Sequence, residues 1–181
     1  MPLGKFPTLV VLVATAAAAA AIFGALHNQL SYSVGPSYFT ELKFQQFNIS
    51  DTLPTRIGAA LVGVQASWWM GVLVGVPAFV YGLIAVPDPR SYLAAGLGAI
   101  GLVFVLSTFA ALAGLLGGLI ADSSGILDGR LAIPAGPDRS DFIRAGFMHD
   151  ASYLAGGLGV LLAFWPMRRA RAIDMARATA A

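Results

Sequence analysis

Residues 57–86 read IGAALVGVQASWWMGVLVGVPAFVYGLIAV, thirty consecutive positions without a charged side chain. A second uncharged run, of thirty-one positions, covers 91–121. About 20 helical residues cross a hydrocarbon core of about 30 Å, so either run is long enough to span a membrane. Two shorter apolar runs fit the same pattern near the two ends of the chain. We therefore predict an all-α integral membrane protein, a transmembrane four-helix bundle that forms one membrane domain over 1–181, with spans at about 8–27, 57–86, 91–121 and 150–167.

The composition of the 181-residue chain agrees with a membrane protein. Hydrophobic residues make up 57% and charged residues 11%, whereas about a quarter of the residues in an ordinary soluble domain are charged. The net charge of +2 is small and several arginines gather in one tail beside a span, which argues against a nucleic-acid partner. The chain has no cysteine, and this excludes disulfides, thiolate metal sites and thiol redox chemistry.

The first apolar run also fits a cleavable signal peptide. Lys5 precedes it, and small residues crowd positions 16–21. The run nevertheless continues through Ile22, Phe23 and Leu26, which makes it long enough to span a membrane. We predict an uncleaved transmembrane helix.

The distribution of lysine and arginine predicts that both termini lie in the cytoplasm, because positively charged loops resist translocation. In this orientation the inner segments hold six basic and two acidic residues, a net charge of +4. The outer segments hold five basic and seven acidic residues, a net charge of −2. The arginines at 168, 169 and 171 follow the last span directly, where the charge bias is strongest. They are expected to anchor the chain near anionic headgroups.

The connections between the spans differ greatly in length. Pro87 and Pro89 interrupt the segment 86–90, which predicts a tight inner turn and an antiparallel helical hairpin. The two outer connections, 27–56 and 122–150, are each nearly thirty residues long and are predicted to be long extracytoplasmic loops. The first is rich in aromatic residues and is expected to fold against the membrane surface; these are Tyr32, Tyr38, Phe39, Phe44 and Phe47.

Small residues along the spans predict where helices touch. In lipid, close backbone approach replaces the hydrophobic drive between helices. The second span carries such residues at four-residue intervals, namely Ala59, Gly63, Ser67, Gly71 and Gly75. We interpret this stripe as a helix contact within the bundle, with homodimerisation as the alternative. The centres of the spans hold no ionisable residue, which argues against a proton-coupled carrier and a voltage sensor.

Polar residues with possible chemistry gather at the predicted outer rim. The only two histidines, His27 and His149, are both expected there, with Asp122 and Asp150 at neighbouring helix ends. Histidine and carboxylate ligands suit zinc, iron or manganese, so these four residues form a candidate metal site. No spacing motif of the zincin kind supports it. In the alternative interpretation Asp150 caps a helix N-terminus and His27 is an interfacial anchor.

The segment HNQLSYSVGPSYF at 27–39, followed by KFQQF at 43–47, resembles a segment of uncharacterised bacterial four-span integral membrane proteins. Weaker likeness extends to 68–71 and 149–153. The resemblance implies a location in the bacterial inner (plasma) membrane and directs attention to the outer face. It implies no catalytic role and no cofactor.

Two classes of function remain open. The first is a non-enzymatic membrane module that binds a partner protein, lipid or small ligand through its aromatic outer loops, since aromatic residues are enriched at recognition surfaces. The second is a metal-dependent membrane enzyme or metal-handling protein. A transporter is a weaker third possibility. We favour the first class, with the bilayer and a membrane protein partner or a second copy of the chain as partners. The candidate ligand-binding residues are His27, Gln29, Tyr32, Tyr38, His149 and Asp150.

Overall fold

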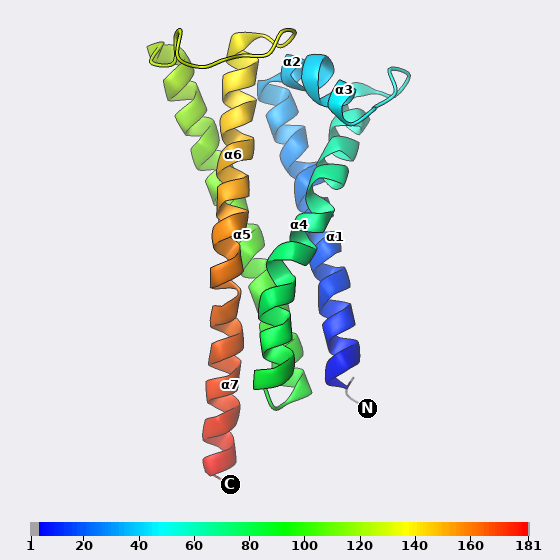
Figure 1. The fold of residues 1–181 in the computed structure, drawn as a ribbon, viewed down its shortest axis with the longest axis vertical. Helices are drawn as coiled ribbons and strands as arrows, with labels where there is room; N and C mark the ends of the chain where they lie inside the picture. Colours follow the sequence, from blue (N-terminus) through cyan, green and yellow to red (C-terminus); the bar gives the residue numbers. More distant parts are fainter. Residues whose placement is uncertain (1–3, 181) are drawn as a thin grey trace. The chain divides into compact units, whose positions relative to one another are not determined.

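The computed structural model describes residues 4–180, and this part of the chain is helical without any strand (Figure 1). Five helices are long, and three short ones follow one another between the first and second of these. The elements in chain order are α1 (Lys5–Val34), α2 (Pro36–Tyr38), η1 (Phe39–Lys43), α3 (Phe44–Gln46), α4 (Thr55–Ala85), α5 (Pro89–Ser124), α6 (Arg139–Leu162) and α7 (Phe164–Thr179).

Four helical segments are long and apolar enough to cross a membrane, which confirms the predicted number of spans. They are α1, α4, α5 and the nearly continuous helix Arg139–Thr179 formed by α6 and α7. Between 17% and 39% of each apolar window is buried inside the protein, so most of these apolar residues lie on the surface. Soluble proteins rarely expose so much contiguous apolar surface, whereas a bilayer covers it. The fold therefore indicates a multi-pass membrane protein.

The helices extend well beyond the uncharged runs. α1 continues to Val34, so the predicted first outer loop starts with a helical segment. α6 begins at Arg139, which places His149 and Asp150 inside the helix rather than at its start. Asp150 is therefore not an N-terminal cap. That role belongs to Asp138, whose Oδ1 accepts the backbone N–H groups of Ser140 (2.8 Å) and Asp141 (3.3 Å).

The contacts divide the chain into two compact units. Unit 1 comprises 1–20, 68–106 and 155–181, and unit 2 comprises 21–67 and 107–154. Each unit contains parts of all four spanning segments. The core of unit 1 is built from Leu12, Ala16, Ala78, Phe79, Val86, Tyr92, Ala95, Ala99, Ala163 and Met167. The core of unit 2 is aromatic and centres on Tyr38, Phe39, Ala59 and Ala145.

The small-residue stripe of α4 contacts α1, as the spacing predicted. In unit 2, a Cβ atom added to Gly63 would overlap the backbone of Gly24. In unit 1, a Cβ atom added to Gly71 would overlap the carbonyl group of Ala16. Glycine is needed at both positions because the two backbones approach closely, and not because of an unusual φ angle.

The turn between α4 and α5 is fixed by two carboxylates of unit 1. Asp88 caps α5 and accepts hydrogen bonds from the backbone N–H and the hydroxyl of Ser91, both at 3.1 Å. The bond from the Ser91 backbone N–H is the main reason why the pKa of Asp88 lies below its usual value. Asp174 of α7 accepts bonds from the Asp88 N–H (3.1 Å) and the Ser91 hydroxyl (2.8 Å). These bonds attach α7 to the turn.

The contact at Gly71 gives a test of helix packing. Gly71→Leu is expected to destabilise the protein by about 1–3 kcal/mol or more, because the added side chain meets backbone that cannot rotate away. The measurement is the thermal unfolding midpoint in detergent. Gly101→Leu on α5 is the control, since a Cβ atom at Gly101 meets no atom within 4 Å. Equal midpoints for the two variants would contradict the assignment of the stripe as a helix contact.

Candidate functional site

The two histidines of the chain lie against each other in unit 2. His27 comes from α1 and His149 from α6, and their ring centroids are 4.7 Å apart with the rings perpendicular. Both side chains are buried, with His27 9% and His149 7% exposed. The site therefore joins two segments that are more than a hundred residues apart in the sequence. Phe23, one helical turn before His27, stacks on the His27 ring at 5.5 Å.

The two histidines differ in their hydrogen bonds. A bond of 3.3 Å joins Nε2 of His149 to the hydroxyl of Ser31. Nε2 of His27 is buried and has no hydrogen-bond partner among the residues that the structure describes. Leaving a buried polar atom unpaired costs about 1–3 kcal/mol, and such atoms are rare in folded proteins. This nitrogen is the most unusual feature of the site.

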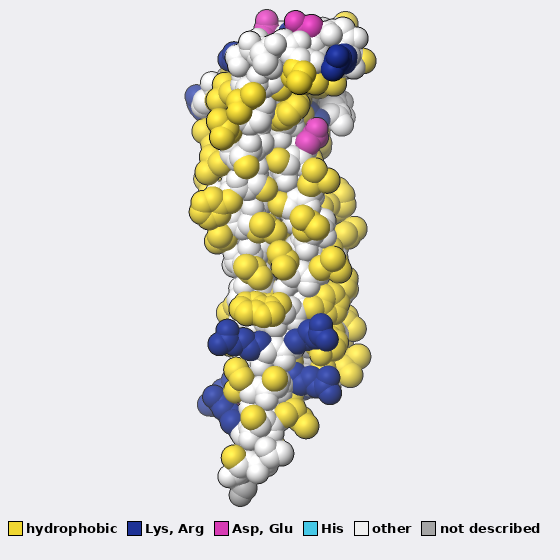
Figure 2. Space-filling model, turned by 90° about the vertical axis from the view of Figure 1, so that its left-hand side faces the viewer, with side chains coloured by type: hydrophobic (Ala, Val, Ile, Leu, Met, Phe, Trp, Pro, Cys, Tyr) yellow, Lys and Arg dark blue, Asp and Glu magenta, His cyan; other side chains and the backbone are white. Residues whose placement is uncertain are grey.

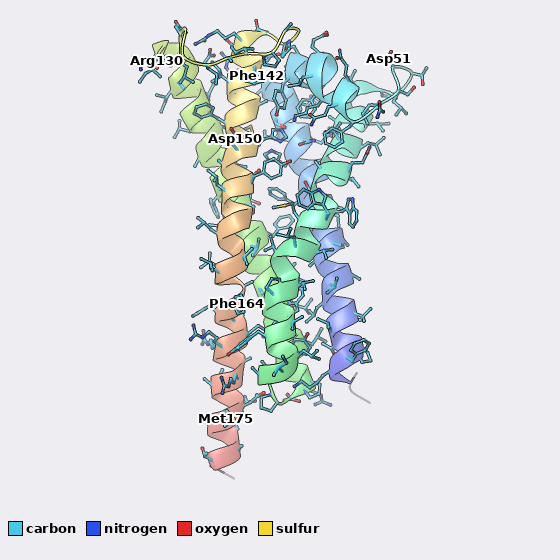
Figure 3. The ribbon with its side chains drawn as sticks, viewed as in Figure 1. Asp51, Arg130, Phe142, Asp150, Phe164 and Met175 are labelled. Carbon is cyan, nitrogen blue, oxygen red and sulfur yellow. The ribbon has the colours of Figure 1, made fainter. Side chains whose placement is uncertain are left out.

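Two aromatic side chains of the next segment pack against His149. The ring centroids of Tyr38 and Phe39 lie 5.3 Å and 6.0 Å from that of His149. Phe142 of α6 packs against Tyr38 at 5.8 Å and is labelled in Figure 3. We call the helical segment that carries Tyr38 and Phe39, residues 36–46, the aromatic cap. It comprises α2, η1 and α3.

A π-helical turn forms the middle of the aromatic cap. It covers Phe39–Lys43, between two single turns of α-helix. π-turns are rare, and they occur frequently at functional sites. The cap is fixed to α6 through Ser37, whose backbone N–H and hydroxyl both donate to Oδ2 of Asp141, at 2.9 Å and 2.7 Å. Gly35 allows this approach, because a Cβ atom there would lie 2.6 Å from the carbonyl oxygen of Asp141.

Charges around the cap are partly buried. Burial lowers the pKa of Lys43, and the negative charge of Asp150 acts in the opposite direction. The Lys43 ammonium lies 5.3 Å from the centre of the Tyr38 ring. Burial raises the pKa of the Tyr38 phenol well above its usual value, and Tyr153 and Asp150 add to this effect. Tyr38 is therefore neutral at ordinary pH.

Three other predicted ligand-binding residues lie beside the pair but not in it. Asp150 is exposed on α6 (Figure 3), since consecutive helical residues point about 100° apart. Gln29 faces α4 and donates to the carbonyl oxygen of Arg56 at 2.9 Å. The Arg56 guanidinium lies 5.3 Å from the centre of the Tyr32 ring, and Tyr32 touches the cap through Phe39.

Asp122 does not join the histidines, contrary to the sequence-based expectation of a four-residue cluster. Its carboxylate pairs with Arg139 at 3.1 Å and Arg144 at 2.7 Å, and it accepts the Ser140 hydroxyl at 3.0 Å. α5 and α6 are antiparallel, and it is Gly114, about 12 Å along α5 from Asp122, that lies against Ala151. In residues 4–180 there is no group of three or more histidine, aspartate or glutamate side chains placed to hold a metal ion.

Three residues of the site were missed in the sequence. Ser31 binds His149, Phe39 covers it, and the fully buried Asn28 donates to the carbonyl oxygen of Ala59 at 2.9 Å. Ser31 is four residues after His27 and thus on the same helix face. That spacing is a usable signal only if the helix is known to continue past His27.

Compared with protein-family models, with curated proteins and with solved structures, the chain matches none of them. The geometry of its own residues is therefore the basis for a functional proposal.

The bond between Ser37 and Asp141 should control the mobility of the aromatic cap. Asp141→Ala removes the carboxylate that accepts two hydrogen bonds from Ser37, each worth about 1.5–3 kcal/mol. We expect amide hydrogen exchange in residues 36–46 to become at least about tenfold faster. Asp51→Ala, an exposed acid in the turn before α4, is the control. Unchanged exchange in the Asp141 variant would show that the cap is held by its aromatic contacts alone.

Proposed function

We propose that the protein is a non-enzymatic binding module of the bacterial inner membrane whose histidine pair, beneath the aromatic cap, binds a small ligand. The unpartnered Nε2 of His27 is the observation that carries this proposal. A ligand that hydrogen bonds to this nitrogen would satisfy a buried polar atom that the described residues leave unpaired. The surrounding rings supply an apolar wall, as in most small-molecule sites.

The aromatic cap favours a small ligand over a protein partner. Tyr38 is 6% exposed and Phe39 is fully buried, so these two rings are turned inward and are not offered to a partner. Because these two rings pack against His149, the proposal includes a movement of the cap that opens the histidine pair. The rare π-turn and the few bonds that fix the cap to α6 are compatible with such a movement.

A transition-metal ion is the second candidate for this site. Two imidazole rings with centroids 4.7 Å apart provide two nitrogen ligands, and imidazole suits zinc, copper, iron and nickel. Structural zinc sites use four protein ligands, so a metal here would need further donors. Asp150 is the nearest acidic residue in the sequence, whereas Asp122 is already paired with two arginines.

Within the membrane we propose a four-helix bundle with both termini in the cytoplasm. The six basic residues of the inner segments support this orientation, as does the arginine cluster after Met167. The cap and the segment 125–138 then form two extracytoplasmic connections, and the histidine pair lies beneath the outer surface.

The orientation can be tested with reporter fusions. A C-terminal green fluorescent protein fusion is expected to fluoresce, and a C-terminal alkaline phosphatase fusion is expected to be inactive, because the arginines after the last span keep the tail inside. Fusions after Ser50, in the first outer connection, serve as the reverse control. An active C-terminal phosphatase would reject the orientation.

The ligand site can be tested by replacing one nitrogen. His27→Phe keeps a ring of similar size against Phe23 and removes Nε2. Protein extracted in mild detergent is expected to carry a bound species in native mass spectrometry. The variant is expected to accumulate normally and to lose at least about 90% of that species, since one hydrogen bond in a dry site is worth about 1.5 kcal/mol or more.

The controls distinguish a small ligand from a metal ion and test whether the histidine pair is the binding site. Leu30→Ala, at an exposed position of α1, should keep the bound species. Elemental analysis, with titration of Zn²⁺ and Cu⁺ into the purified protein, identifies a metal. If the native protein carries no bound species and binds neither ion, both candidates are refuted. If His27→Phe and His149→Phe retain the bound species, its site lies elsewhere.

A further inference from the structure

A groove in unit 1 separates α5 from α7. Its volume is about 350 Å³, within the range of about 300–1,000 Å³ typical of ligand sites. Mostly small residues form the α5 side of the groove, and mostly larger residues form its α7 side. The lining includes Ser91, Ala94, Ala95, Gly98 and Leu102 on α5, and Trp165, Arg169, Ile173 and Arg177 on α7.

The hollow results from the residues of α5. Ala94, Ala95 and Gly98 present little or no side chain, and a Cβ atom added to Gly98 meets nothing within 4 Å. Leu102 continues the same side of α5 and makes it apolar. Between Ala94 and Leu102 this surface carries no polar side chain, which suits a hydrocarbon chain, and the hydroxyl of Ser91 at its end donates to Asp174.

The α7 side changes from aromatic and apolar to basic. Trp165, Arg169, Ile173 and Arg177 are spaced by four residues and thus share one helix face. The Arg169 guanidinium lies 5.7 Å from the centre of the Trp165 ring, which orients it beside the apolar part. Figure 2 shows basic side chains gathered on α7 next to a surface of hydrophobic side chains.

The groove therefore crosses the boundary between the apolar span and the charged tail. The uncharged run ends at Met167, and four arginines follow within ten positions. Tryptophan is enriched at this depth of a bilayer, and arginine at the headgroup level. One neighbouring acid, Asp174, is buried and directs its carboxylate to the Asp88 N–H and the Ser91 hydroxyl.

We propose that this groove binds one anionic phospholipid. One acyl chain lies along Gly98 and Leu102 against Trp165, and the phosphate lies at Arg169, with Arg177 adding attraction from the next turns of the helix. The complementarity of charge and the change from apolar to basic lining along one groove favour this occupant over a peptide or a second copy of the chain. The site is separate from the histidine pair and does not depend on its function.

The test measures binding of phosphatidylglycerol to the delipidated protein in detergent by native mass spectrometry, with phosphatidylcholine as the neutral lipid. Arg169→Gln and Arg177→Gln are each expected to weaken phosphatidylglycerol binding about fivefold, because one basic residue near an anionic headgroup is worth about 1 kcal/mol. Arg171→Gln has the same charge change on the same helix but does not line the groove, and it should have less than half of this effect.

The apolar half of the site is tested by filling it. Gly98→Phe should reduce phosphatidylglycerol binding at least fivefold without loss of stability, because the added ring enters open space. Gly101→Phe is the matched control, since its position is equally open but outside the groove. Glycerol phosphate, which lacks acyl chains, should bind at least tenfold more weakly than the lipid. The proposal would be overturned if Arg169→Gln and Arg171→Gln lost phosphatidylglycerol binding equally, or if Gly98→Phe bound the lipid fully. A bound mass that only a peptide or a second copy of the chain explains would also overturn it.

Discussion

Close backbone contact between α1 and α4 is the constraint on which much of this structure depends. Lipid offers no hydrophobic drive between helices, so the packing relies on van der Waals contact, and only small residues permit that contact. Gly24 meets Gly63 in unit 2, and Ala16 meets Gly71 in unit 1. Both units thus contain the same kind of close backbone contact at small residues, between the same pair of helices. The large apolar side chains that remain point outward, where a bilayer would cover them.

This contact also determines where polar groups lie in unit 2. With α1 held against α4, Asn28 reaches the Ala59 carbonyl group, and the neighbouring face of α1 turns His27 and Ser31 toward α6. α1 is therefore bonded on two sides, through Asn28 to α4 and through Ser31 to α6, whereas Nε2 of His27 has no hydrogen-bond partner among the described residues. Ordinary interfacial anchors would point to water and need no such arrangement.

The sequence was sufficient for the number of spans, the small-residue contact and the tight turn between α4 and α5, because hydropathy, residue size and proline act locally. It was insufficient for the helix ends. The absence of charge marks the part of a helix suited to hydrocarbon, whereas α1 and α6 continue through polar residues such as Ser31 and Arg144. The misplacement of Asp122 has a similar cause. Its arginine partners lie 17 and 22 residues further along the chain, and no local pattern relates an acid to partners across a long connection.

For the proposed ligand site at the histidine pair, electrostatics favour a neutral molecule over a divalent ion. A buried charge is expensive unless an opposite charge accompanies it. Phenyl and phenol rings line the site, Asp150 is exposed, and the ammonium of Lys43, which lies 5.3 Å from the centre of the Tyr38 ring, would repel a cation. A neutral molecule that shares a hydrogen bond with His27 needs no compensating charge. A metal ion would need additional donors and charge that residues 4–180 do not place around the pair, so the hydrogen-bonded ligand is the simpler occupant of this site.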